Sequence, residues 1–92
     1  MLSAAERKQL KARAHRLEPV VLIGAKGVSD DVVSEIERAL RAHELIKVRA
    51  PSLDRHAREV AFQALCERIG AEGVQHIGKI FILYRKRDGD QE

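Results

Sequence analysis

One short segment, IFILY at residues 80–84, restricts the fold of this chain more than any other. All of its side chains are apolar or aromatic, which is typical of a central strand that is covered on both faces. The segment LIKVRA at residues 45–50 differs, because apolar and basic side chains alternate from Ile46 onward. That alternation predicts a half-buried strand, with Lys47 and Arg49 on its polar face.

Local capping signals predict three helices. Ser3 followed three residues later by Glu6 is a capping-box pattern, and Pro19 ends the first helix because the residue before a proline avoids helical angles. Ser29 is a suitable N-cap for a second helix, since acids follow it at the positive end of the helix dipole. Asp54 is a suitable N-cap for a third helix.

The connections between strands determine most of the topology. Residues 20–23, VVLI, form a first strand, and residues 73–85 form a hairpin around a Gly78-Lys79 turn. Helical crossovers make the first three strands parallel and place both crossover helices on one face. We therefore predict an α/β fold of the two-layer α+β type, helix-strand-helix-strand-helix-strand-strand. Its four-stranded mixed sheet has the order 1-2-4-3, with strand 4 antiparallel; these rules do not determine which face the first helix covers.

Charge is unevenly distributed along the chain. Lys and Arg number 17 against 14 Asp and Glu, which gives a formal net charge of only +3. Residues 1–16, however, contain five Lys and Arg side chains and Glu6 as their one acid. This clustering favours a polyanionic partner, nucleic acid before an acidic protein or a membrane surface. Because the only aromatic residues are Phe62, Phe81 and Tyr84, we do not expect a platform of stacked aromatic rings.

The length of 92 residues indicates one small domain, which we assign to residues 1–87, followed by a disordered tail at residues 88–92. No apolar run approaches the about 18 residues of a membrane helix. The N-terminus lacks the apolar stretch of a secretory signal. Cys66 is the only cysteine, which excludes an internal disulfide and a cysteine-based zinc site. We expect a cytoplasmic location.

Three stretches of the chain, LIGAKGVSD, HELIKVR and IGKIFILYR, together with the basic first helix resemble the YhbY family. This family is the stand-alone bacterial form of the CRM domain, named for chloroplast RNA splicing and ribosome maturation. The resemblance spans nearly the whole chain and implies RNA binding, association with the precursor of the large ribosomal subunit, and the strand order 1-2-4-3. The G-x-x-G loop of the family corresponds here to Gly24, Ala25, Lys26 and Gly27.

The glycine loop is suited to binding a phosphate group through its backbone. Glycine permits unusual backbone angles and a close approach, so that N–H groups at the start of a helix can face a phosphate oxygen. KH domains clamp nucleic acid with such a loop. Lys26 would add a mobile positive charge, whereas the acids at residues 30–31, a departure from the family, should repel phosphate. The alternative is an ordinary strand-to-helix turn with a solvated lysine.

One face of the first helix is basic. Lys8, Lys11 and His15 lie at positions i, i+3 and i+7, and Arg7 borders them. We interpret this face as a surface that follows an RNA backbone, because no acids compensate its charge. The alternative is an ordinary solvated face. If RNA binds another surface, the next basic candidates are Lys47, Arg49 and residues 85–87.

No catalytic or metal-binding pattern stands out. The segment GVQHIGK resembles a phosphate loop, but Ile80 replaces the Ser or Thr that would bind magnesium, and a strand follows it. The four histidines show no metal-ligand spacing. We therefore expect a non-catalytic RNA-binding protein that acts in large-subunit assembly, without cofactor, metal, small-molecule substrate or membrane partner. The alternative is a protein-interaction module whose basic face binds an acidic protein.

Overall fold

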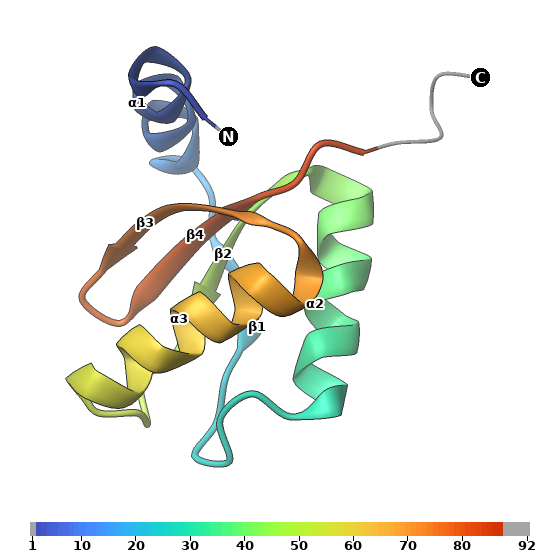
Figure 1. Ribbon diagram of the computed structural model, residues 1–92, viewed down its shortest axis with the longest axis vertical. Helices are drawn as coiled ribbons and strands as arrows, with labels where there is room; N and C mark the ends of the chain where they lie inside the picture. Colours follow the sequence, from blue (N-terminus) through green and yellow to red (C-terminus); the bar gives the residue numbers. More distant parts are fainter. Residues whose placement is uncertain (1, 88–92) are drawn as a thin grey trace.

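The computed structural model describes residues 2–87, which form a four-stranded sheet with helices on both faces (Figure 1). The strand order is β1-β2-β4-β3; β1 and β2 are parallel, and β4 is antiparallel to both of its neighbours. This confirms the predicted α+β fold, while the predicted tail at residues 88–92 lies outside the described residues. The elements are α1 (Ala4–Ala14), β1 (Pro19–Leu22), α2 (Asp30–His43), β2 (Leu45–Arg49), α3 (Arg55–Ile69), β3 (Glu72–Ile77) and β4 (Ile80–Tyr84).

Side-chain caps begin all three helices, as predicted. At α1 the Ser3 N–H donates to Glu6 Oε1 at 2.8 Å, while the Glu6 N–H donates to Ser3 Oγ at 3.0 Å. The backbone hydrogen bond from Ser3 also lowers the pKa of the Glu6 carboxyl group. A first-turn N–H donates to Ser29 Oγ at 3.2 Å in α2 and to Asp54 Oδ1 at 2.8 Å in α3. Each cap satisfies a backbone donor that the helix itself leaves unpaired.

The two faces of the sheet carry cores of different size. Within residues 2–87, thirteen buried apolar side chains form the core beneath α2 and α3, whereas five form the core beneath α1. The side chains of β4 alternate between them: Phe81 and Leu83 enter the larger core, and Ile82 enters the smaller one. The segment IFILY is therefore the central strand that its composition predicts. α1 adds a partial third layer, on the face that the crossover rules left undetermined.

Two arginines beyond β4 hold the C-terminal ends of α2 and α3. Arg85 Nη1 donates to the carbonyl oxygen of Ile69 at 2.9 Å, at the end of α3. Its Nη2 lies 2.9 Å from Glu37 Oε1 of α2, in an ion pair that is partly buried. Because the last carbonyl groups of a helix have no partner within that helix, a guanidinium at this position stabilises the helix end.

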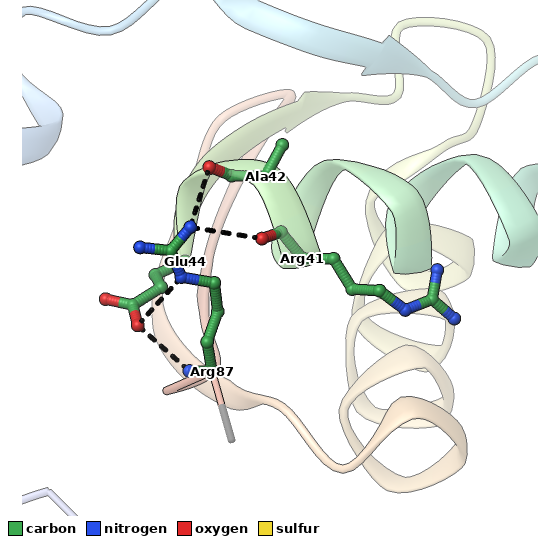
Figure 2. Close-up of polar contacts among 4 residues, drawn as sticks. All are labelled: Arg41, Ala42, Glu44 and Arg87. Atoms are coloured by element: carbon green, nitrogen blue, oxygen red, sulfur yellow. Dashed lines mark hydrogen bonds and ion pairs between the residues drawn. The ribbon is translucent and has the colours of Figure 1, made fainter. Parts of the chain in front are cut away.

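Arg87 makes the corresponding contacts at the end of α2 (Figure 2). Its Nη1 donates to the carbonyl oxygens of Arg41 and Ala42, both at 3.4 Å. Its backbone N–H donates to Glu44 Oε2 at 2.9 Å, and this bond lowers the pKa of the Glu44 carboxyl group. Glu44 follows the helix with φ of 64°, a region that non-glycine residues rarely adopt. Arg87 and Glu44 together fix the turn from α2 into β2.

None of the three helices within residues 2–87 combines the length and the apolar character that crossing a membrane requires. The longest dimension of the molecule is 38 Å. α1 lies at one end of this dimension, and the loop between β1 and α2 lies at the other end (Figure 1).

Candidate nucleic-acid interface

The glycine loop between β1 and α2 is a tight, exposed turn. The Gly27 N–H donates to the carbonyl oxygen of Gly24 at 3.0 Å, and the Ser29 N–H donates to the carbonyl oxygen of Gly27 at 3.0 Å. Gly27 has φ of 77°, where a side chain would strain the backbone, so this position requires glycine. Ala25 and Lys26 form the exposed corner of the turn.

The backbone of this corner is available to a ligand. The turn uses the Gly27 N–H, but no hydrogen bond recorded for residues 2–87 uses the N–H of Ala25 or Lys26. Both groups lie just before α2, whose N-terminal end adds positive potential. The Lys26 side chain is exposed beside them. This arrangement can bind one phosphate oxygen through two backbone donors and a mobile ammonium group.

The acidic pair after the loop is partly compensated. Arg68 of α3 donates through Nη2 to Asp30 Oδ1 at 2.7 Å. The Asp30 side chain is 91% exposed, so this pair contributes little to folding stability. It nevertheless places a positive charge next to the acid that was expected to repel phosphate. Asp31 is exposed on the first turn of α2.

The basic residues predicted on one face of α1 do not all line the same hollow. Lys8 and His15 are exposed and Lys11 is half-buried. Lys11 and His15 border a hollow of about 200 Å³ on the sheet surface, whereas Lys8 does not line it. The rest of the hollow is made by strand residues, namely Lys47, Gln75, Ile77, Ile80 and Ile82. The structure thus brings two predicted site residues next to Lys47, which the sequence marked only as a further candidate.

Arg7 has a structural contact that the sequence did not reveal. Its Nη1 donates to the carbonyl oxygens of Gly73 and Val74 at 2.6 and 3.1 Å. These bonds join α1 to β3 and are partly buried. A guanidinium that is held by two carbonyl groups has less freedom to follow a phosphate than the exposed ammonium group of Lys8. The prediction that Arg7 contacts RNA stays a prediction.

Residues 2–87 contain no group of three or more His, Cys, Asp and Glu side chains that could hold a metal ion. His76 lies instead in an aromatic cluster, with ring centroids 5.5 Å from Phe62 and 4.9 Å from Phe81. Burial raises the pKa of the Cys66 thiol, which keeps it protonated and unreactive at neutral pH.

The chain is similar to known proteins over nearly its whole described length. A model of the CRS1 / YhbY (CRM) domain matches residues 2–85. A Haemophilus influenzae protein named "RNA-binding protein" is 43% identical over 84 residues, which cover 91% of this chain and 85% of the relative. The "Probable RNA-binding protein PA4753" of Pseudomonas aeruginosa is 39% identical over 85 residues, covering 92% of this chain and 82% of the relative.

The fold is also shared with a solved structure. The solution structure of the hypothetical protein SAV1595 from Staphylococcus aureus aligns with a TM-score of 0.85 at 28% identity. The alignment covers 98% of this chain and 94% of that one. Since the family model spans nearly the whole described chain and the relatives match over most of their own length, this chain belongs to the CRS1/YhbY family of CRM domains.

Proposed function

We propose that this chain is a non-catalytic RNA-binding protein that binds ribosomal RNA during assembly of the large ribosomal subunit. The observation that carries this proposal is the exposed glycine loop, in which the N–H groups of Ala25 and Lys26 are left available within the described chain. The names of the two relatives, both described as RNA-binding, support the same class of ligand. The resemblance to the YhbY family supports the ribosomal target and a cytoplasmic location.

In this proposal the loop binds one phosphate group of the RNA backbone. The two N–H groups donate to a phosphate oxygen, and Lys26 neutralises its charge at the same time. Lys8, Lys11 and His15 contact further phosphates along α1. Contacts of this kind position the protein on RNA without reading the base sequence. Any sequence preference must come from another part of the surface.

The test is a pull-down of the tagged full-length chain from cells, performed with and without nuclease. We expect ribosomal RNA and the precursor of the large subunit to co-purify, and nuclease treatment to release the precursor. A variant that combines Lys8→Ala, Lys11→Ala and Lys26→Ala should retain less RNA. Arg38→Ala is the matched control for a lost charge, because Arg38 is exposed on α2, which covers the opposite face of the sheet. Capture of an acidic protein that survives nuclease would favour the protein-interaction module instead.

A further inference from the structure

The smaller helix layer leaves part of the sheet uncovered. Leu45 of β2 is buried beneath α1, and Lys47 and Arg49 follow it on the same face because strand side chains alternate. The strand register pairs Arg49 with Leu22 of β1 on one side and with Ile80 of β4 on the other. Ile80 in turn pairs with Ile77 of β3, so a row of side chains crosses all four strands beyond the end of α1.

This uncovered part carries much of the exposed apolar surface of the molecule. Leu22 is 58% exposed, Ile77 56% and Val20 49%. The fourth large exposed apolar side chain described is Val60, at 55%, and it lies on α3, away from this face. Leu22 and Ile77 lie on opposite edge strands, with Arg49 and Ile80 between them, so this face presents apolar and basic side chains together.

The open positions of this face are basic rather than acidic. They are residues 20, 22, 47, 49, 75, 77 and 80, and none of them is Asp or Glu, although Glu18 lies beside Val20 at the edge of the face. Lys47 and Arg49 lie between the apolar side chains, and Lys11 and His15 of α1 border the hollow at one end. At the other end, the Ile23 N–H donates to the Arg49 carbonyl oxygen at 2.8 Å, one residue before the glycine loop. The pairing of β1 with β2 therefore extends to the residue before the glycine loop.

We propose that this open sheet face, made by these seven strand positions, binds an unpaired stretch of the RNA strand. The inference rests on the proposed function and extends it. Bases lie against Leu22, Ile77 and Ile80, and the flanking phosphates meet Lys47 and Arg49. Only unpaired nucleotides can present a base surface to aliphatic side chains, because a duplex stacks its bases internally. The absence of acids on these positions favours a polyanion over a protein partner, whose own apolar contacts would need no excess of positive charge.

The positions of α1 and the glycine loop also define a path for the RNA strand along the protein. α1 and the glycine loop lie at opposite ends of the molecule, and the open sheet face lies between them (Figure 1). In this proposal an RNA backbone that contacts both Lys11 and Lys26 crosses this face. The face supplies no aromatic ring at its seven positions, so base contacts are dispersive and should tolerate different sequences.

The test compares the wild-type chain with five single variants, one of which is Lys26→Ala in the glycine loop. The probes are a single-stranded RNA of about 16 nucleotides, the upper range of a single-strand site, and its perfect duplex. Ile77→Ser should weaken single-strand binding about fivefold, through lost apolar contact, without changing the salt dependence. Arg49→Ala should reduce the log–log salt slope by about 0.7 for a single strand. The matched controls Val60→Ser and Arg38→Ala should bind as the wild type does.

The outcomes separate this inference from the proposed function. If the wild type binds neither probe, the proposed function fails, and this inference fails with it. If Lys26→Ala weakens binding while Ile77→Ser and Arg49→Ala bind normally, RNA binding stands and the sheet-face inference is overturned. Equal binding of the duplex, with equal losses in the variants, also overturns it. Shifts of the Leu22, Ile77 and Ile80 methyl signals by NMR, on titration with the single strand alone, would support it.

Discussion

The two faces of the sheet differ in how completely helices cover them. Beneath α2 and α3 the described strands direct their side chains into one continuous core, which includes Ile23, Val48 and Phe81 at 0% exposure. Beneath α1 only one end of the sheet is covered, and Leu22 and Ile77 stay more than half exposed on the same face. The comparison indicates that the face beneath α2 and α3 contributes most of the buried core. The face beneath α1 contributes less to the core and leaves side chains exposed to solvent.

The largest expected effect is on stability and uses two adjacent residues of β4. Leu83 faces the larger core at 0% exposure, and Ile82 faces the smaller one at 4%. Leu83→Ala should lower the free energy of unfolding by about 4 kcal/mol, and Ile82→Ala by about 2 kcal/mol, within the usual range for such truncations. The core around Leu83 is enclosed and cannot collapse into the cavity left by the truncation. The smaller core around Ile82 lies beneath the edge of α1 and can relax. Urea denaturation measures both values, and equal losses would contradict the comparison.

The next effect tests what holds α1 to the sheet. Arg7→Ala should lower the free energy of unfolding by about 1–2 kcal/mol, because it removes two charge-assisted hydrogen bonds to β3 carbonyl groups. Lys8→Ala, at the neighbouring exposed position, is the matched control and should change stability by less than about 0.5 kcal/mol. Thermal and urea unfolding would measure both. A stable Arg7→Ala variant with reduced RNA affinity would instead make Arg7 an RNA contact.

Local signals in the sequence predicted much of the fold. Ser3 and Ser29 cap helices through partners three residues away, and the apolar strand IFILY requires a central position. The face covered by α1 could not be predicted, because the handedness rule applies to crossovers between parallel strands and α1 precedes the first strand. The partner of Arg7 was equally hidden. Arg7 donates to backbone carbonyl groups 66 and 67 residues away. Because every residue has a carbonyl group, no sequence pattern marks these two as its partners.

The candidate site likewise has one part that local sequence predicts and another part that depends on how the helices dock. The tight turn of the glycine loop could be predicted from four consecutive residues, 24–27, because its conformation depends on local backbone geometry. The hollow that joins Lys11 and His15 to Lys47 depends on how α1 docks, so no local pattern predicts it. The basic residues 85–87 were ambiguous for a similar reason. Arg85 and Arg87 contact helix ends in the structure, and a sequence pattern cannot distinguish that role from RNA binding.

A third effect separates the two glycines of the loop. Gly27→Val should lower the free energy of unfolding by about 1–2 kcal/mol, because its positive φ strains a β-branched residue. Gly24→Val should change stability less, because Gly24 has no positive φ and an added Cβ meets no atom within 4 Å. Both variants should weaken RNA binding more than folding if the loop clamps phosphate. Undiminished RNA affinity in a folded Gly27→Val variant would contradict the hypothesis that the glycine loop clamps a phosphate group.

A smaller effect depends on pH and concerns the end of α2. The hydrogen bond from the Arg87 backbone holds the pKa of Glu44 below its usual range. A carboxyl group with a lowered folded-state pKa stabilises the fold above its unfolded pKa, and this contribution is lost as the pH falls through the folded value. The stability difference between the wild type and Glu44→Gln should therefore be present at pH 7 and vanish in acid. A difference that persists unchanged in strong acid would contradict this account.

The smallest effect on stability belongs to the exposed lysines, and for them the salt dependence of RNA binding is the useful measurement. Lys8 and Lys26 contribute little to folding because exposed charges are screened by water, whereas Lys11 is half-buried, so the triple alanine variant should melt only slightly below the wild type. On a long single strand, each lost phosphate contact should reduce the log–log salt slope by about 0.7, and the triple variant by about two units.

The position of the loop and α1 at opposite ends of the 38 Å molecule sharpens this test (Figure 1). An RNA of about four nucleotides, the lower range of a single-strand site, should reach only one end, whereas one of about 16 should reach both. With the short RNA, Lys26→Ala or the Lys8→Ala/Lys11→Ala pair should change the slope, but not both. If both changed the slope equally with the short RNA, the two basic regions would form one compact footprint. Additive losses on the long RNA alone would place the strand along the open face of the sheet.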